Sequence, residues 1–211
     1  LKTWFGKLLT WILNSPQGQE EARQANNHST AHDAQVIAFA MYAGNMKVAR
    51  EVINAIPRKR LFTQIEPDGK QPHELRRTLA FGYSQFNLSH FIDIFMMARK
   101  IGISIDNATS EDGRSFYKAM DFLVPYVGKD VKAWPYQQIS EWKYKQQEFC
   151  KDLYRTFLLN PERKDYLKLY KTHRIIDWKD RFNLLWMEAD DVDNAYAFAC
   201  GQLQFAMQCA A

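Results

Sequence analysis

Four side chains in the first half of the chain have the chemistry to remove a proton from the carbon beside a carboxylate. Asn27 and His28 are adjacent, and Arg77 and Tyr83 follow about fifty positions later. An amide, an imidazole and a guanidinium can offset a carboxylate's charge, which stabilises the anion left when the neighbouring carbon loses its proton. A phenol or an imidazole can transfer that proton. Together they predict an elimination reaction on an acidic sugar.

The first pair also has a purely structural interpretation. Asn is a favoured helix N-cap, and Thr30 followed by Asp33 resembles a capping box. Capping would explain Asn27, but it does not explain the imidazole of His28. The capping and the chemical interpretations therefore both stay open for this segment.

The second group lies in a stretch with helical periodicity that continues to residue 101. On one continuous helix, Arg76 and Tyr83 are seven positions apart and would share a face, with Arg77 roughly in line. An Arg and a Tyr on one face can present a cation and a phenol to the same anion. The structural alternative is an Arg paired with Glu74 or Asp33, and a Tyr packed in the core.

The elements that must position these side chains are helices. Asn27 and His28 open a helix that Gly44 closes, whereas the polar stretch 17–24 is read as a connection. The other predicted helices span residues 4–13, 46–56, 72–101, 112–124, 137–159, 163–172 and 191–208. No segment predicts a strand pair or a hairpin. The chain is therefore predicted to be all-α, built from antiparallel helix pairs, and both a bundle and a toroid fit that pattern.

The composition is that of a folded and mildly basic protein. With 211 residues, 46% of them hydrophobic, we expect one domain over 1–211 with a sizeable core. A net charge of +4 suits an acidic partner, but the basic residues are scattered, which argues against nucleic acid. We interpret the densest basic run, 58–60, as a solvated helix exit. No apolar run reaches the length of a membrane helix.

Metal and cofactor chemistry is not expected. Cys150, Cys200 and Cys209 lack metal-type spacing, and the His and Asp residues near His28 form no recognised ligand pattern. Cys200 and Cys209 fall in the apolar C-terminal segment, where a free Cys acts as a small hydrophobe.

Several short motifs, in the right order, resemble the alginate lyase-type polysaccharide lyases. The matching segments are 4–13, 15–20, 26–35, 68–78, 83–88 and 134–138. The resemblance implies an α/α toroid, of which this chain would be the C-terminal and incomplete part. A helical portion that usually comes earlier in the family would supply the other wall of the cleft. It also implies that uronic-acid polymers are cleaved by β-elimination.

The resemblance assigns roles to the amide, imidazole, guanidinium and phenol of the two segments. Asn27 would help to neutralise the substrate carboxylate, and His28 would be a neutraliser or a general base. Arg77 would hold the charged sugar or orient the phenol, with Arg76 as a substrate contact or, if the register differs by one, the functional arginine. Tyr83 would be the catalytic acid and also the base.

Three further residues are assigned to substrate binding. They are Gln71, Trp134 and Tyr136, and the two aromatic rings are equally well explained by core packing. The chain departs from the family pattern at Ser29, where Gly is frequent, and at His32, where an aromatic residue is frequent. Ser29 matters only if its backbone needs a positive φ, and His32 removes any phenol or stacking role at that position.

The expected substrate is a β-1,4-linked polyuronate, with glucuronan or polymannuronate ahead of guluronate-rich chains. In the first two polymers H5 and O4 lie on the same ring side, so one tyrosine can serve both. Two other functions remain: a non-catalytic carbohydrate-binding toroid, and a glycoside hydrolase, which needs two facing carboxylates. The expected location is the periplasm or the exterior of a bacterium, where such polymers are met.

Overall fold

A computed structural model of the chain describes residues 1–175 and 180–182. The chain forms two compact units, Leu1–Arg174 and Ile175–Ala211, and the site lies in the first. The prediction of a single domain over 1–211 stays a prediction. The predicted helix over 191–208 lies outside the described residues, as do Cys200 and Cys209. No helix in the described part is long and apolar enough to cross a membrane.

Residues 1–174 are built from helices and their connections, which confirms the predicted all-α class. The α-helices are α1 (Lys2–Asn14), α2 (Pro16–Arg23), α3 (Asn27–Ala43), α4 (Met46–Ile56), α5 (Phe62–Gln64), α6 (Pro72–Leu75), α7 (Ala80–Lys100), α8 (Phe116–Leu123), α9 (Trp142–Leu159) and α10 (Lys164–His173). A π-helical turn covers Pro57–Leu61, and 3-10 turns cover Val124–Tyr126 and Val131–Ala133. Within the described residues β-pairing is limited to the isolated bridges Leu79–Gln138 and Thr109–Ser115.

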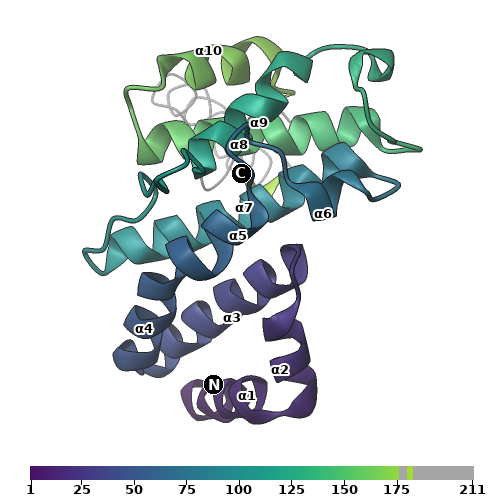
Figure 1. The fold of residues 1–211 in the computed structure, drawn as a ribbon. Coiled ribbons are helices and arrows are strands. Elements are labelled where there is room, and N and C mark those ends of the chain that lie inside the picture. The colour runs from purple at the N-terminus through teal and green to yellow at the C-terminus, as the bar shows by residue number, and fades with distance from the viewer. Residues whose placement is uncertain (176–179, 183–211) are drawn as a thin grey trace, which may run out of the picture. The chain divides into compact units, whose positions relative to one another are not determined.

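The three long helices α3, α7 and α9 lie side by side and run in the same direction (Figure 1). Near the start of α7, Phe81 packs on Trp142 at the start of α9, with ring centroids 4.9 Å apart. At the other end, Arg99 Nη2 donates to Leu159 O over 3.2 Å. The segments α4–α5 and α8 lead the chain back between them, and α10 packs against α9 after it. The predicted antiparallel helix pairs are therefore confirmed, and the long helices begin at a common end.

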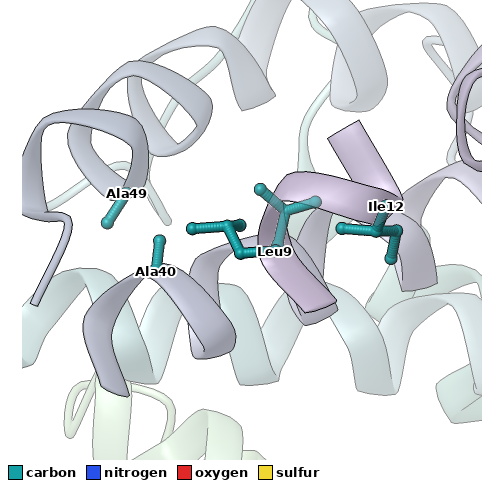
Figure 2. Close-up of a cluster of buried hydrophobic side chains, with 5 residues drawn as sticks. Leu9, Ile12, Ala40 and Ala49 are labelled. Carbon is teal, nitrogen blue, oxygen red and sulfur yellow. The ribbon is translucent and has the colours of Figure 1, made fainter. Parts of the chain in front are cut away.

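Helix α1 packs against α3 and α4 through a small apolar cluster (Figure 2). Leu9 and Ile12 are buried on one face of α1, three positions apart, as the helical period requires. Ala40 and Ala49 present short side chains to Leu9, so the helices approach closely. Burying a Leu or Ile side chain contributes about 1.5–3 kcal/mol. This cluster holds α1 beside α3, and residues of both helices line the same cleft.

The stretch 17–24, read as a connection, is helix α2, so that expectation was wrong. Its polar sequence carries no apolar period because most of the helix is exposed. Ser15 starts it: the backbone there is extended, and the hydroxyl accepts the N–H of Gly18 over 3.0 Å. Gly18 also permits the tight corner with α1, since a Cβ there would lie 1.9 Å from Ile12 O.

The continuous helix predicted over 72–101 was also wrong, because the chain leaves the helix after Leu75 and starts again at Ala80. A distant segment stabilises the new start. Gln138 Oε1 accepts the N–H groups of Phe81 and Gly82, over 3.0 and 3.3 Å. The backbone of residues 137–139 bonds to that of residues 78–80 on either side. These partners lie more than fifty positions away, so no local pattern indicates the break.

Other boundaries were predicted with mixed success. The helix Met46–Ile56 and the left-handed Gly44, with φ 85°, are confirmed. Pro57 was predicted to stop this helix, but the chain continues after α4 as the π-helical turn Pro57–Leu61. Helix α8 begins at Phe116, not at 112, and α9 begins at Trp142, not at 137. In α9 the reason is the pairing of residues 137–139 with the start of α7.

Candidate active site

A cleft of about 460 Å³ opens between α1–α2, α3 and the start of α7. It brings together Asn27 and His28 at the start of α3, Arg77 in the α6–α7 link, and Tyr83 in the first turn of α7. The four residues meet because α3 and α7 begin at the same end of the unit. The remaining lining residues are Trp11, Ile12, Gln17, Gly18, Glu21, Ala31, His32, Gln35 and Phe86.

Asn27 is tied to the α6 segment by a buried carboxylate. Its backbone N–H donates to Glu74 Oε1 and its Nδ2 to Glu74 Oε2, each over 2.7 Å. Glu74 is 1% exposed, and burial raises the pKa of its carboxyl against the opposing effect of the Asn27 hydrogen bonds. Because Nδ2 carries two protons, one remains after the bond to Glu74. The amide is thus held in one orientation at the cleft.

Of the two interpretations of Asn27, the structure does not support capping. Asn26 is the N-cap, and its Oδ1 accepts the N–H of His28 over 3.3 Å. The expected capping box is absent: Thr30 Oγ1 donates to Gln64 Oε1 over 3.0 Å, and Asp33 pairs with an arginine. Asn27 is therefore free of the capping role that competed with the chemical interpretation.

His28 is oriented by Glu21, a residue that the sequence interpretation missed. His28 Nδ1 lies 2.8 Å from Glu21 Oε2, and each side chain is 49% exposed. A carboxylate only accepts, so Nδ1 is the nitrogen that donates to Glu21, and in the neutral ring Nε2 then carries the lone pair. Glu21 stands in the polar stretch that was read as a connection, so nothing in the local pattern singled it out.

Arg77 and Tyr83 stack on each other at the cleft. The guanidinium carbon of Arg77 lies 3.9 Å from the centroid of the Tyr83 ring, within the range of a cation–π contact. They do so across the α6–α7 link and not along one helix, as had been predicted. Arg76 is exposed and does not line the cleft. Of the two arginines, the geometry thus places Arg77 beside the phenol.

Gln71, predicted to bind substrate, instead belongs to a polar network behind the cleft. It is 2% exposed, its Nε2 donates to Ser84 O, and its Oε1 accepts from Asn87 Nδ2 over 2.8 Å. Asn87 also donates to Gln64 Oε1 over 2.9 Å. Both ends of the Gln71 amide are occupied within the protein. Its place in the fold is therefore the support of α7 and not the cleft lining.

Ser29, which stands where the family often has Gly, belongs to the same network and does not need a positive φ. It is an ordinary helical residue of α3, since Glu141 is the one non-glycine residue with positive φ in the described part. Its hydroxyl accepts from Gln64 Nε2 over 3.1 Å.

Trp134 and Tyr136 do not line the cleft, contrary to the expected stacking platform. Trp134 is 5% exposed and packs edge-on against Phe81, with ring centroids 5.4 Å apart. Tyr136 packs on Trp134, at 5.2 Å between centroids. The two rings anchor the segment that supports the start of α7. The core interpretation of this motif is the one that the geometry favours.

The basic run 58–60 was interpreted as a solvated helix exit, which is wrong for Arg60. Its Nε donates to Asp33 Oδ2 over 2.7 Å, and its Nη2 donates to Ala22 O over 2.8 Å. Burial alone would raise the pKa of Asp33, but hydrogen bonds from His32 and Arg60 hold it below its usual range. His32 Nδ1 lies 3.2 Å from Asp33 Oδ1, so this buried pair fixes the ring of His32 in the cleft wall.

The carboxylates of the described residues do not form the facing pair that a glycoside hydrolase requires. Asp68 pairs with Lys70, Asp93 pairs with Arg155, and Glu74 faces Asn27. Among the described residues, Glu21 is the one carboxylate that lines the cleft. In residues 1–175 and 180–182, no group of three His, Cys, Asp or Glu side chains is placed to hold a metal ion.

Comparisons with known proteins identify the family. A family described as "Alginate lyase" matches residues 1–134, a range that contains the four cleft residues. Among solved structures, a similar chain is the crystal structure of an alginate lyase from Bacteroides ovatus, with 46% identity and a TM-score of 0.85. The match covers 89% of this chain and 49% of that one, so this chain spans about half of that protein's length. No curated protein gives a significant match.

Proposed function

This chain belongs to the alginate lyase family, and from that premise we propose that it cleaves a β-1,4-linked polyuronate by β-elimination. The observation that carries the proposal is the meeting of Asn27, His28, Arg77 and Tyr83 in one cleft. Two segments about fifty residues apart supply them, and the family match spans both. An acidic polymer also suits the net charge of +4.

In the proposed reaction, Tyr83 transfers the proton. The phenolate form of its oxygen takes H5, the C4–O4 bond breaks, and the electron pair of the C5–H bond forms the C4–C5 double bond. The proton then passes to O4, which becomes the hydroxyl of the leaving sugar. Each positioned proton transfer of this kind contributes about 10²–10⁴ in rate. Tyr83 lines the cleft, as this role requires.

Three other groups would stabilise the charge that gathers on the carboxylate as H5 leaves. The guanidinium of Arg77 lies over the Tyr83 ring in the cleft lining, where its N–H groups can donate to the carboxylate. Asn27 offers its remaining amide proton, held in place by Glu74. His28, oriented by Glu21, faces the same cleft.

The preferred substrates follow from the stereochemistry. In glucuronan and polymannuronate H5 and O4 lie on one ring side, so Tyr83 can act as base and then as acid. In guluronate they lie on opposite sides, and His28 would have to be the base. We propose glucuronan or polymannuronate as the better substrates, met in the periplasm or the exterior of a bacterium.

The test is the absorbance of the 4,5-unsaturated uronate formed on incubation with each polymer. Wild-type protein should produce it, and Tyr83→Phe should lower kcat by at least about a hundredfold, because the proton-transfer group is lost. Tyr42→Phe is the matched control, since Tyr42 lies on α3, is 51% exposed and lines no part of the cleft.

Full activity of Tyr83→Phe would overturn the assignment of that residue. Retention of the polymer by wild-type protein without unsaturated product would favour the carbohydrate-binding alternative instead.

A further inference from the structure

A second hollow of about 210 Å³ adjoins the cleft at Tyr83. It shares Tyr83 and Phe86 with the cleft, and its other lining residues are Leu79, Gly82, Glu141 and Lys145. Tyr83 therefore stands between two hollows, one of which contains the groups assigned to charge neutralisation. A polymer cut beside Tyr83 must place sugar units on both sides of that residue.

Lys145 is held against α7 at this second hollow. A Cβ on Gly82 would lie 3.1 Å from Lys145 Cγ and 3.3 Å from its Cδ and Cε. The aliphatic part of the Lys145 side chain therefore packs on α7 at Gly82, which has no side chain of its own. Lys145 is half-buried. Its Nζ lies 5.2 Å from the ring centroid of Tyr144, and among the described residues it forms no ion pair with a carboxylate.

Lys145 and Glu141 are the two charged side chains that line this hollow among the described residues, and the first N–H groups of α9 lie beside them. Helix α9, 18 residues long, begins here without a side-chain cap on its first N–H groups. The positive end of the helix dipole favours an anion at this place. Glu141 precedes the helix in a left-handed conformation, with φ 59°, and its side chain is exposed.

We propose that this second hollow is the binding subsite for the neighbouring sugar unit, and that Lys145 pairs with the carboxylate of that unit. The proposal rests on the proposed function, because it extends the same polymer past Tyr83. It adds a specificity residue to that function: Lys145 selects an acidic unit at the position next to the one held by Asn27 and Arg77. A polymer with neutral units in alternate positions would bind less tightly.

The first test replaces the charge and keeps the apolar stem. Lys145→Met should raise KM for the polyuronate about tenfold and change kcat by less than about threefold, because a charge-assisted contact to substrate is lost in both ground and transition states. Lys145→Arg should keep KM within about threefold of wild type. Lys143→Met is the matched control, since Lys143 lies on the same helix, is exposed and lines neither hollow.

Ionic strength provides a second readout. The difference in KM between wild type and Lys145→Met should shrink as salt is raised from about 0.05 M to 0.5 M, because salt screens the contact. Equal KM values for Lys145→Met and Lys143→Met, with active wild-type protein, would overturn this inference and leave the proposed function standing. Absence of unsaturated product with the wild type would instead overturn the proposed function.

Discussion

At the scale of single residues, the orientation of Asn27 depends on Glu74. The two bonds of 2.7 Å fix both the first N–H of α3 and the side-chain amide. Glu74 does not line the cleft, so its effect on chemistry has to pass through Asn27. We regard it as a positioning residue.

Glu74→Gln should therefore lower kcat more than it raises KM. Gln can accept only one of the two Asn27 protons, and its NH₂ group opposes the other, so the amide turns. We expect a loss of roughly tenfold to hundredfold in kcat, with KM within about threefold, in line with small misplacements of catalytic groups. Steady-state kinetics on the polyuronate measure both constants.

The control for that measurement is Glu20→Gln, because Glu20 is exposed on α2 and lines no part of the cleft. It should behave as wild type. A Glu74→Gln protein with unchanged kcat would show that the Asn27 amide needs no such support.

At the scale of elements, the corner between α1 and α2 shapes one wall of the cleft. Gly18 makes that corner possible, since a Cβ there would meet Ile12 O at 1.9 Å and Ile12 C at 2.7 Å. These are backbone atoms, so the contact cannot be relieved by a side-chain rotation. The corner itself must open.

Gly18→Ala should lower the free energy of unfolding by about 1–3 kcal/mol, the usual range for overpacking. It should also raise KM, because Gly18 and its neighbour Gln17 line the cleft. Urea unfolding and steady-state kinetics check the two effects.

Gly6→Ala is the matched control with the opposite sign. A Cβ on Gly6 meets nothing within 4 Å, and Gly6 lies inside α1. Ala should stabilise the helix by about 0.5–1 kcal/mol there. Equal effects of the two substitutions would contradict the role assigned to the corner.

At the scale of the whole unit, Asp152 makes stability depend on pH. It lies on α9, is fully buried against α7, and accepts from Gln85 Nε2 over 2.7 Å. Burial raises the pKa of Asp152 to about 7, and Arg155 and Gln85 only partly oppose this. Between about pH 4 and 7 the folded protein therefore holds a proton that the unfolded chain releases.

The sign follows from linkage. The pKa of Asp152 is higher in the folded protein than in the unfolded chain. The contribution of Asp152 to the free energy of unfolding is therefore fully present below about pH 4 and is lost as the pH rises through about 7. Wild-type protein should lose stability relative to Asp152→Asn over this range, by up to about 1.4 kcal/mol per pH unit. Urea unfolding at pH 5 and pH 7 measures the difference.

Glu51→Gln serves as the control for pH, since Glu51 is 61% exposed on α4. Its pH profile should run parallel to that of wild type. An Asp152→Asn protein whose profile also runs parallel to wild type would refute the assignment.

The sequence alone determined the features that depend on local periodicity and on short-range partners. Helical spacing predicted the all-α class, and the exit at Gly44 and the helix Met46–Ile56 were predicted to the residue. The order of the motifs predicted the family and named the four residues that meet in the cleft. Local signals suffice for these because a helix closes its own hydrogen bonds within four residues.

Only the tertiary structure decided which partner each polar side chain takes. Glu74 binds Asn27 across 47 positions, and Gln138 supports the start of α7 across more than fifty. The tertiary structure also shows that Arg77, and not Arg76, lines the cleft, and that Gln71 belongs to the polar network behind the cleft. A buried polar group must find a partner, but its sequence neighbours do not say which. The parallel packing of α3 and α7 brings those partners together, and with them the two halves of the site.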